Sequence, residues 1–141
     1  MKKIIFILTI LLTLNIETIM AADKKDKATD AQRVAYVLRN IGVKRDIQSK
    51  LKPLLESYLR EFNAAEAPYE KLKDKLKPQI KMGNISEAQG QQLLNEKWAT
   101  DERELAVKKS YEKKFKTVLP TKKVYECYRL LNDKSSKILD Y

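Results

Sequence analysis

The side chains that could carry out chemistry in this chain are carboxylates, lysines and one thiol, because the sequence contains no histidine. Histidine is the commonest general base near neutral pH and the commonest transition-metal ligand. Its absence excludes nucleophilic pairs of the Ser-His and Cys-His types. Gly42, Gly83 and Gly90 are the only glycines and lie too far apart to form a phosphate-binding loop. We therefore expect a protein that is not an enzyme and that holds no cofactor and no metal.

Acidic pairs such as Asp101 and Glu104 are the remaining candidates for acid-base catalysis. Arg103 and Lys108 lie beside them in the sequence. Mixed charges at this spacing are typical of a solvent-exposed helix face, where side chains of opposite charge pair. We therefore interpret these carboxylates as surface residues.

Cys127 is the only cysteine, so no disulfide can form within one subunit. It shares one side of a predicted helix with Val124, Tyr128 and Leu131. A cysteine among apolar neighbours usually behaves as a small buried hydrophobic residue. The sequence favours a buried Cys127, and the alternative is a disulfide between two subunits.

The N-terminal segment has the pattern of a secretory signal peptide. Lys2 and Lys3 precede an apolar run over residues 4–14, and Ala21 and Ala22 close the segment. The apolar run is shorter than the ~20 residues that a transmembrane helix needs, so we expect an exported protein. The expected division of the chain is a cleaved signal peptide over residues 1–22, a flexible polar linker over residues 23–29 and a single domain over residues 30–141.

The chain is strongly basic, with 29 lysines and arginines against 19 aspartates and glutamates. An exported basic protein rarely meets nucleic acid, so the expected partners are acidic protein segments and anionic envelope surfaces. Many lysines surround two predicted helices; we expect most to be solvated and a subset to form a basic concave face. They are Lys71, Lys73, Lys75, Lys77 and Lys81 on one helix and Lys108, Lys109, Lys113, Lys114 and Lys116 on the next.

Four helices are expected after residue 29, and capping boxes mark where two of them begin. In a capping box, a Ser or Thr side chain and a Glu or Gln side chain three residues later each bond to the other residue's backbone N–H. Thr29 with Gln32 and Ser86 with Gln89 fit this pattern. The expected helices begin near Asp30, Lys44, Ser86 and Pro120, and the first two end at Gly42 and near Met82.

The second helix carries a heptad seam of apolar residues. At about 1.5 Å per residue it is of order 60 Å long, so we expect an elongated molecule. Pro68 lies deepest inside this helix, where its missing N–H and its clash with the Ala64 carbonyl should bend the axis. Gly83 and Asn84 form a tight turn that should fold the third helix back antiparallel. The seam comprises Leu51, Leu55, Tyr58, Phe62, Ala65, Tyr69, Leu72 and Leu76.

Aromatic residues on this seam have two interpretations. Stripes at helical spacing are usually core, and on that ground we expect Phe62 to be buried. The other tyrosines are amphipathic and could line a rim or groove. The third helix carries a broader apolar stripe that we expect to pack on the second helix, comprising Leu94, Trp98, Leu105, Tyr111, Phe115, Val118 and Leu119.

Residues 115–125, with the sequence Phe-Lys-Thr-Val-Leu-Pro-Thr-Lys-Lys-Val-Tyr, resemble the end of a Spy/CpxP-like periplasmic protein. Members of this family carry a Leu-Thr-x-x-Gln type motif twice. The second copy would start at Leu119, where the leucine is kept, Pro120 replaces threonine and Lys123 replaces glutamine. The first copy would fall near residues 43–47, where only the apolar first position is kept.

The resemblance covers about residues 30–133. It implies a four-helix, hooked-hairpin subunit that pairs with a second copy into a shallow antiparallel cradle in the periplasm. Family members act as ATP-independent chaperones, as inhibitors of envelope-stress sensor kinases or as metal-responsive proteins. The metal-responsive role uses histidine and often methionine, so we place it last for this chain.

The leading expectation is a periplasmic holdase-type chaperone that binds unfolded or acidic client segments during envelope stress. Lysines would steer the encounter, and apolar groups would then hold the client weakly. One alternative is a regulatory module that inhibits the periplasmic domain of an envelope-stress sensor. Another is a structural protein that binds anionic lipid or glycolipid. The expected client contacts are Tyr58, Tyr69, Lys73 and Lys77.

Overall fold

The computed structural model describes residues 27–141, which contain four α-helices, one short 3-10 helix and no strand. The expected all-α fold class is confirmed. No helix within these residues is long and apolar enough to cross a lipid bilayer. The expected signal peptide, and the expected linker as far as residue 26, lie outside the described residues. The elements are α2 (Asp30–Asn40), α3 (Arg45–Met82), α4 (Glu87–Phe115), α5 (Thr121–Leu131) and the 3-10 helix η1 (Ser136–Asp140).

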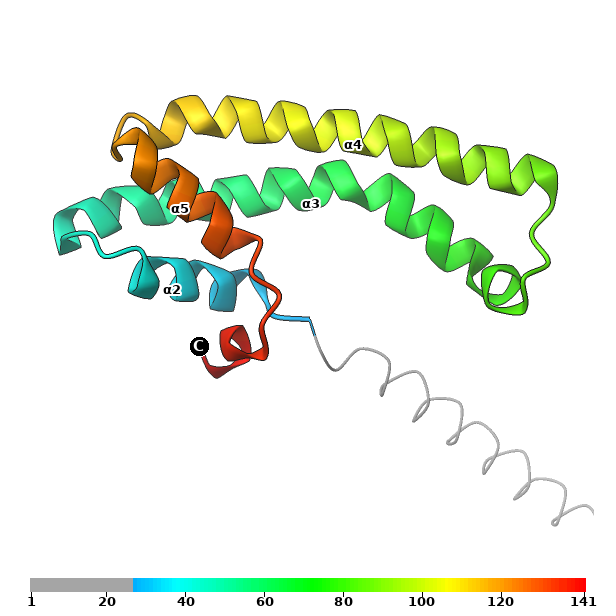
Figure 1. Ribbon diagram of the computed structural model, residues 1–141, viewed down its shortest axis with the longest axis horizontal. Coiled ribbons are helices and arrows are strands. Elements are labelled where there is room, and N and C mark those ends of the chain that lie inside the picture. The colour runs from blue at the N-terminus through cyan, green and yellow to red at the C-terminus, as the bar shows by residue number, and fades with distance from the viewer. Residues whose placement is uncertain (1–26) are drawn as a thin grey trace, which may run out of the picture.

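Helices α3 and α4 form the long antiparallel hairpin that dominates the molecule (Figure 1). Gly83 ends α3 in the left-handed conformation, with a φ of 66°, which costs glycine little because it has no Cβ. Ser86 then begins α4 with a capping box: its hydroxyl accepts from the Gln89 N–H, and the Gln89 side chain accepts from the Ser86 N–H. The short turn forces the two helices to run side by side.

The axis of α3 turns in its second half, where Pro68 lies (Figure 1). Proline has no N–H to donate, so the carbonyl of Ala64 loses its normal helical partner. One residue further on, the Ala65 carbonyl accepts a hydrogen bond of 3.2 Å from Nε of Arg103 on α4. The expected bend is present, and a side chain from the facing helix binds the backbone beside it.

The apolar core lies at the end of the hairpin opposite the turn, which we call the base. Helices α2 and α5 gather there against the start of α3 and the end of α4, and the 3-10 helix η1 packs on α2 (Figure 1). Tyr58 is the centre of the core, with ring centroids 5.5 to 6.0 Å from those of four other aromatic residues. These are Phe62, Tyr111, Phe115 and Tyr128. Within the described residues, the buried members of the core cluster run from Val34 to Ile138, and Ala28, from the expected linker, packs against them.

Cys127 is fully buried in this core. Burial raises the pKa of its thiol to about 12, because the apolar surroundings disfavour the thiolate. A buried thiol that stays protonated is a poor nucleophile. The interpretation of Cys127 as a buried hydrophobic residue is confirmed.

The residues of the expected family motif join α5 to the rest of the base. Leu119 is buried, and Pro120 is the residue that precedes the first turn of α5. Nζ of Lys123 donates to the Ile41 carbonyl at 2.5 Å and to Glu126 at 2.8 Å. Because the last carbonyls of a helix have no partner within it, Lys123 fastens the end of α2 to the start of α5.

Truncation of Phe115 tests this assignment of the core. Phe115→Ala should lower the free energy of unfolding by about 3–5 kcal/mol, because the side chain is fully buried. Leu105→Ala is the matched control on the same helix; its side chain is half exposed, so we expect a change within about 0.5 kcal/mol. Urea unfolding followed by circular dichroism measures both. Equal losses for the two variants would show that the core has been placed on the wrong side of α4.

Candidate binding surface

Two hollows lie beside the C-terminal segment. One has a volume of about 210 Å³ and includes Arg33, Asp133 and Ile138 in its lining, which makes it smaller than the roughly 300–1,000 Å³ of a ligand pocket. Arg39 and Tyr141 line part of the other hollow, and the guanidinium of Arg39 lies 5.4 Å from the centroid of the Tyr141 ring. The charge of Arg39 is therefore engaged by an aromatic ring of the same chain. Among residues 27–141, no three His, Cys, Asp or Glu side chains gather in a group that could hold a metal ion. The surface of the hairpin is the stronger candidate for a site.

The inner face of α4, which packs on α3, is marked by Thr100, Val107 and Tyr111. Thr100 and Tyr111 are at most 1% exposed, and Val107 packs against the core cluster. They are seven and four residues apart, the spacing that keeps side chains on one face of a helix. This face fixes how α4 is rotated against its partner.

A second apolar stripe lies on the opposite face of α4. It comprises Leu94, Trp98 and Leu105, which are 49%, 59% and 50% exposed; we call it the outer stripe. Trp98 lies two positions before Thr100 of the inner face, and Leu105 lies two positions before Val107. Two positions along a helix correspond to a rotation of about 200° around its axis. The prediction that these three residues pack on the second helix is therefore wrong, because only one of two opposite faces can do so.

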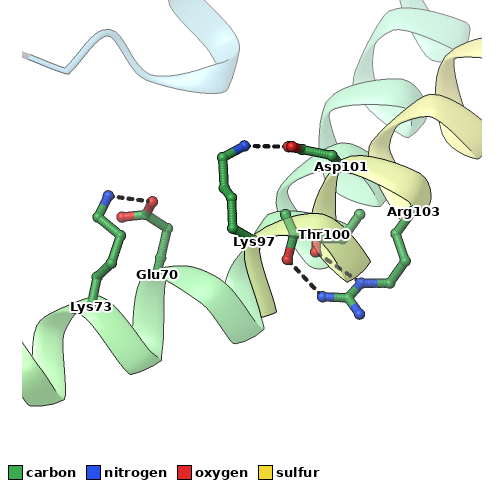
Figure 2. Close-up of polar contacts among 7 residues, drawn as sticks. Glu70, Lys73, Lys97, Thr100, Asp101 and Arg103 are labelled. Carbon is green, nitrogen blue, oxygen red and sulfur yellow. Dashed lines mark hydrogen bonds and ion pairs between the residues drawn. The ribbon is translucent and has the colours of Figure 1, made fainter. Parts of the chain in front are cut away.

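A cluster of charged side chains surrounds Tyr69 midway along the hairpin. The amines of Lys73 on α3 and Lys97 on α4 lie 5.2 and 5.7 Å from the centroid of the Tyr69 ring. Figure 2 shows that both lysines are also paired on their own helices, Lys73 with Glu70 at 2.8 Å and Lys97 with Asp101. Cations over an aromatic face are attracted by its quadrupole, so the cluster joins the two helices. An acidic client would have to displace Glu70 and Asp101.

Arg103 provides a second polar link between the helices (Figure 2). Its guanidinium binds the Ala65 carbonyl, and one of its amino groups also donates to Thr100 at 2.7 Å and to Glu96 at 2.6 Å. The planar guanidinium offers several donors in a fixed geometry. Arg103 therefore stabilises the bent part of α3 rather than offering a charge to a partner.

Among the carboxylates of the hairpin that the structure describes, only Glu104 has a pKa shifted above its ordinary value. Partial burial is the main cause, followed by repulsion from Glu66 on α3; Lys108 and Lys97 oppose the shift. The predicted interpretation of Asp101 and Glu104 as surface residues holds in part. Asp101 pairs with Lys97, whereas Glu104 lies partly buried against the facing helix.

The structure separates the four expected client contacts. Tyr58 is 3% exposed at the centre of the aromatic core, where burial raises the pKa of its hydroxyl strongly; Tyr58 is a core residue and not a surface contact. Tyr69 and Lys73 lie together in the midway cluster. Lys77 is exposed one turn further toward the end of α3. Phe62 is partly buried against the core, as its place on the seam predicts.

Sequence reasoning missed Lys97 and the exposure of Trp98. The signal for Lys97 was present, because the turn at Gly83 and Asn84 fixes which residues of α3 and α4 face each other. Residues at equal distances from the turn along α3 and α4 lie side by side, and Tyr69 and Lys97 are such a pair. The exposure of Trp98 had no comparable signal, since both faces of α4 carry apolar residues.

No family model, curated protein or solved structure matches this chain. The resemblance to Spy/CpxP-like proteins stays a prediction from the sequence, based on residues 115–125, on the order and lengths of the expected helices and on the expected export.

Glu104→Gln should stabilise the protein at pH 7. The pKa of Glu104 is higher in the folded chain than in the unfolded chain, so the folded state binds its proton more tightly and loses stability as the pH rises through this pKa. Glutamine removes that loss. Urea unfolding should show a higher midpoint for the variant at pH 7 and no difference at about pH 3, below the unfolded pKa.

The matched control is Glu102→Gln, an exposed position on the same helix. It should leave the midpoint nearly unchanged at both pH values. A Glu104→Gln variant that is less stable than the parent at pH 7 would mean that attraction to Lys97 and Lys108 outweighs burial.

Proposed function

We propose that this protein is an exported, ATP-independent chaperone that holds unfolded segments of other exported proteins. The observation that carries the proposal is the outer stripe of α4. Its three large apolar side chains are about half exposed along one side of an elongated hairpin, although α4 already packs on α3 through its other face. Exposed apolar surface of this kind is typical of an interaction site.

The outer stripe suits weak and reversible binding. Complete burial of a large apolar side chain contributes about 1.5–3 kcal/mol, so covering the exposed half of each would contribute about 1 kcal/mol. Three such contacts give about 3 kcal/mol before the cost of ordering the client. A client held this weakly dissociates without ATP.

The positive charge of the chain supports the encounter with clients. The chain carries a formal net charge of +10 at pH 7, and long-range attraction raises the rate at which acidic segments arrive. Surface ion pairs contribute only about 0–1 kcal/mol, so exchange of the Glu70 partner of Lys73 for a client carboxylate costs little.

Suppression of aggregation tests the chaperone activity directly. The mature chain, residues 23–141, is added without nucleotide to a chemically unfolded client, and aggregation is followed by light scattering. We expect suppression that increases with the molar excess of the mature chain over the client, because about 3 kcal/mol corresponds to weak binding. The double variant Trp98→Ser with Leu105→Ser should need about thirtyfold more protein for the same effect, since two of the three apolar contacts, about 2 kcal/mol, are lost.

Tyr125→Ser is the matched control, because Tyr125 is 74% exposed but lies on α5 at the base. It should suppress aggregation as well as the parent chain. Trp98 is the only tryptophan in the sequence, so its fluorescence should also shift to the blue when a client covers it. Equal activity of the double variant and the control would remove the outer stripe from the proposal.

The alternative function is that of a regulatory module. Absence of suppression by a folded, helical protein, together with saturable one-to-one binding to a single folded partner, would favour inhibition of a sensor domain.

A second copy of this chain is another possible partner of the outer stripe. Dimerisation through it would double the mass in sedimentation equilibrium and would be abolished by the Trp98→Ser and Leu105→Ser pair.

A further inference from the structure

We infer that the tip of the hairpin docks on an anionic lipid surface. The tip is defined as residues 71–86, the last part of α3 and the turn that leads into α4. It combines an excess of lysines with apolar side chains exposed at the far end of the molecule. Together these features match the headgroup layer of an anionic bilayer, which is negatively charged outside and apolar beneath.

The charge of the tip is nearly all of one sign. Its sequence contains five lysines and a single acidic residue, Asp74. Lys75, Lys77 and Lys81 are exposed. Each lysine close to an anionic membrane adds about fivefold to affinity, so three of them are enough for measurable binding.

The apolar side chains of the tip lie where the hairpin ends. Ile80, Met82 and Ile85 are 42%, 67% and 39% exposed, and none of them belongs to the core cluster. Isoleucine and methionine gain free energy when they enter the boundary between headgroups and acyl chains. They would add to the attraction that the lysines provide.

The shape of the molecule favours a membrane over an acidic polypeptide as the partner. Figure 1 shows the tip projecting as the far end of the hairpin, while α2, α5 and η1 gather at the other end. A projecting end can enter a flat headgroup layer, whereas a peptide is held by a groove that surrounds it. Trp98 and Leu105 of the outer stripe lie on the side of α4 outside the tip, so tip docking does not depend on the proposed chaperone activity.

Cosedimentation with lipid vesicles tests the inference. The mature chain, residues 23–141, is mixed with vesicles of equal parts phosphatidylglycerol and phosphatidylcholine, or of phosphatidylcholine alone. We expect at least tenfold tighter binding to the anionic vesicles. The Lys75→Gln and Lys77→Gln pair should weaken that binding at least tenfold, and the Ile80→Ser and Met82→Ser pair should weaken it at moderate salt.

A matched charge control separates the tip from the overall charge of the chain. Lys50→Gln with Lys52→Gln removes the same charge from exposed positions near the base end of α3. Its binding should change less than twofold. If this pair and the tip pair weaken binding equally, the attraction comes from net charge and the inference is overturned.

A fluorescence measurement locates the contact. In a Trp98→Phe background, Met82→Trp should be quenched by spin-labelled lipid in anionic vesicles, whereas Tyr125→Trp at the base should not. Quenching at the base without quenching at the tip would overturn the inference. So would binding of polyglutamate to the tip lysines with no binding to vesicles, because the partner would then be an acidic protein.

Discussion

The register of the α3–α4 hairpin is the constraint on which the rest of the structure depends. The turn between Gly83 and Ser86 leaves no freedom to slide one helix along the other, because the left-handed glycine and the capping box fix both helix ends. Each cross-helix contact then follows from its distance to the turn. These contacts are Tyr69 with Lys97, Ala65 with Arg103, Phe62 with Lys108 and Tyr58 with Tyr111.

The same register divides the molecule into two unlike halves. At the base, α2 and α5 cover the hairpin, η1 packs on α2, and large aromatic side chains fill the space between the hairpin and α5. Toward the turn, α3 and α4 have only each other among residues 27–141, and contacts such as those of Arg103 and Tyr69 replace a deep core. Apolar residues beyond the inner face of α4 find no further described element to pack on there, and the side chains of the outer stripe and the tip are exposed.

Local signals in the sequence predicted much of this fold. Both capping boxes, the turn at Gly83, the bend near Pro68 and the burial of Cys127 are confirmed, because each depends on a few neighbouring residues. The rotation of α4 was not predictable, since apolar side chains at helical spacing occupy two opposite faces and only tertiary packing selects one. Tyr58 lies on the seam of α3, but an amphipathic tyrosine suits a core or a groove, so the sequence did not show that it is buried. The bond from Lys123 to the Ile41 carbonyl joins residues distant in sequence and has no local signature.

The two ends of the described chain lie close together at the base. Asp30 accepts a hydrogen bond from Asn63 on α3, the side chain of Gln32 donates to the Leu139 carbonyl, and the ring of Tyr141 packs edge-on against Tyr36. Both ends therefore meet beside the first half of α3 and lie well away from the turn (Figure 1). A fluorescent label or a surface anchor attached near Asp30 or near Tyr141 would therefore lie at the base, and the tip would extend away from it.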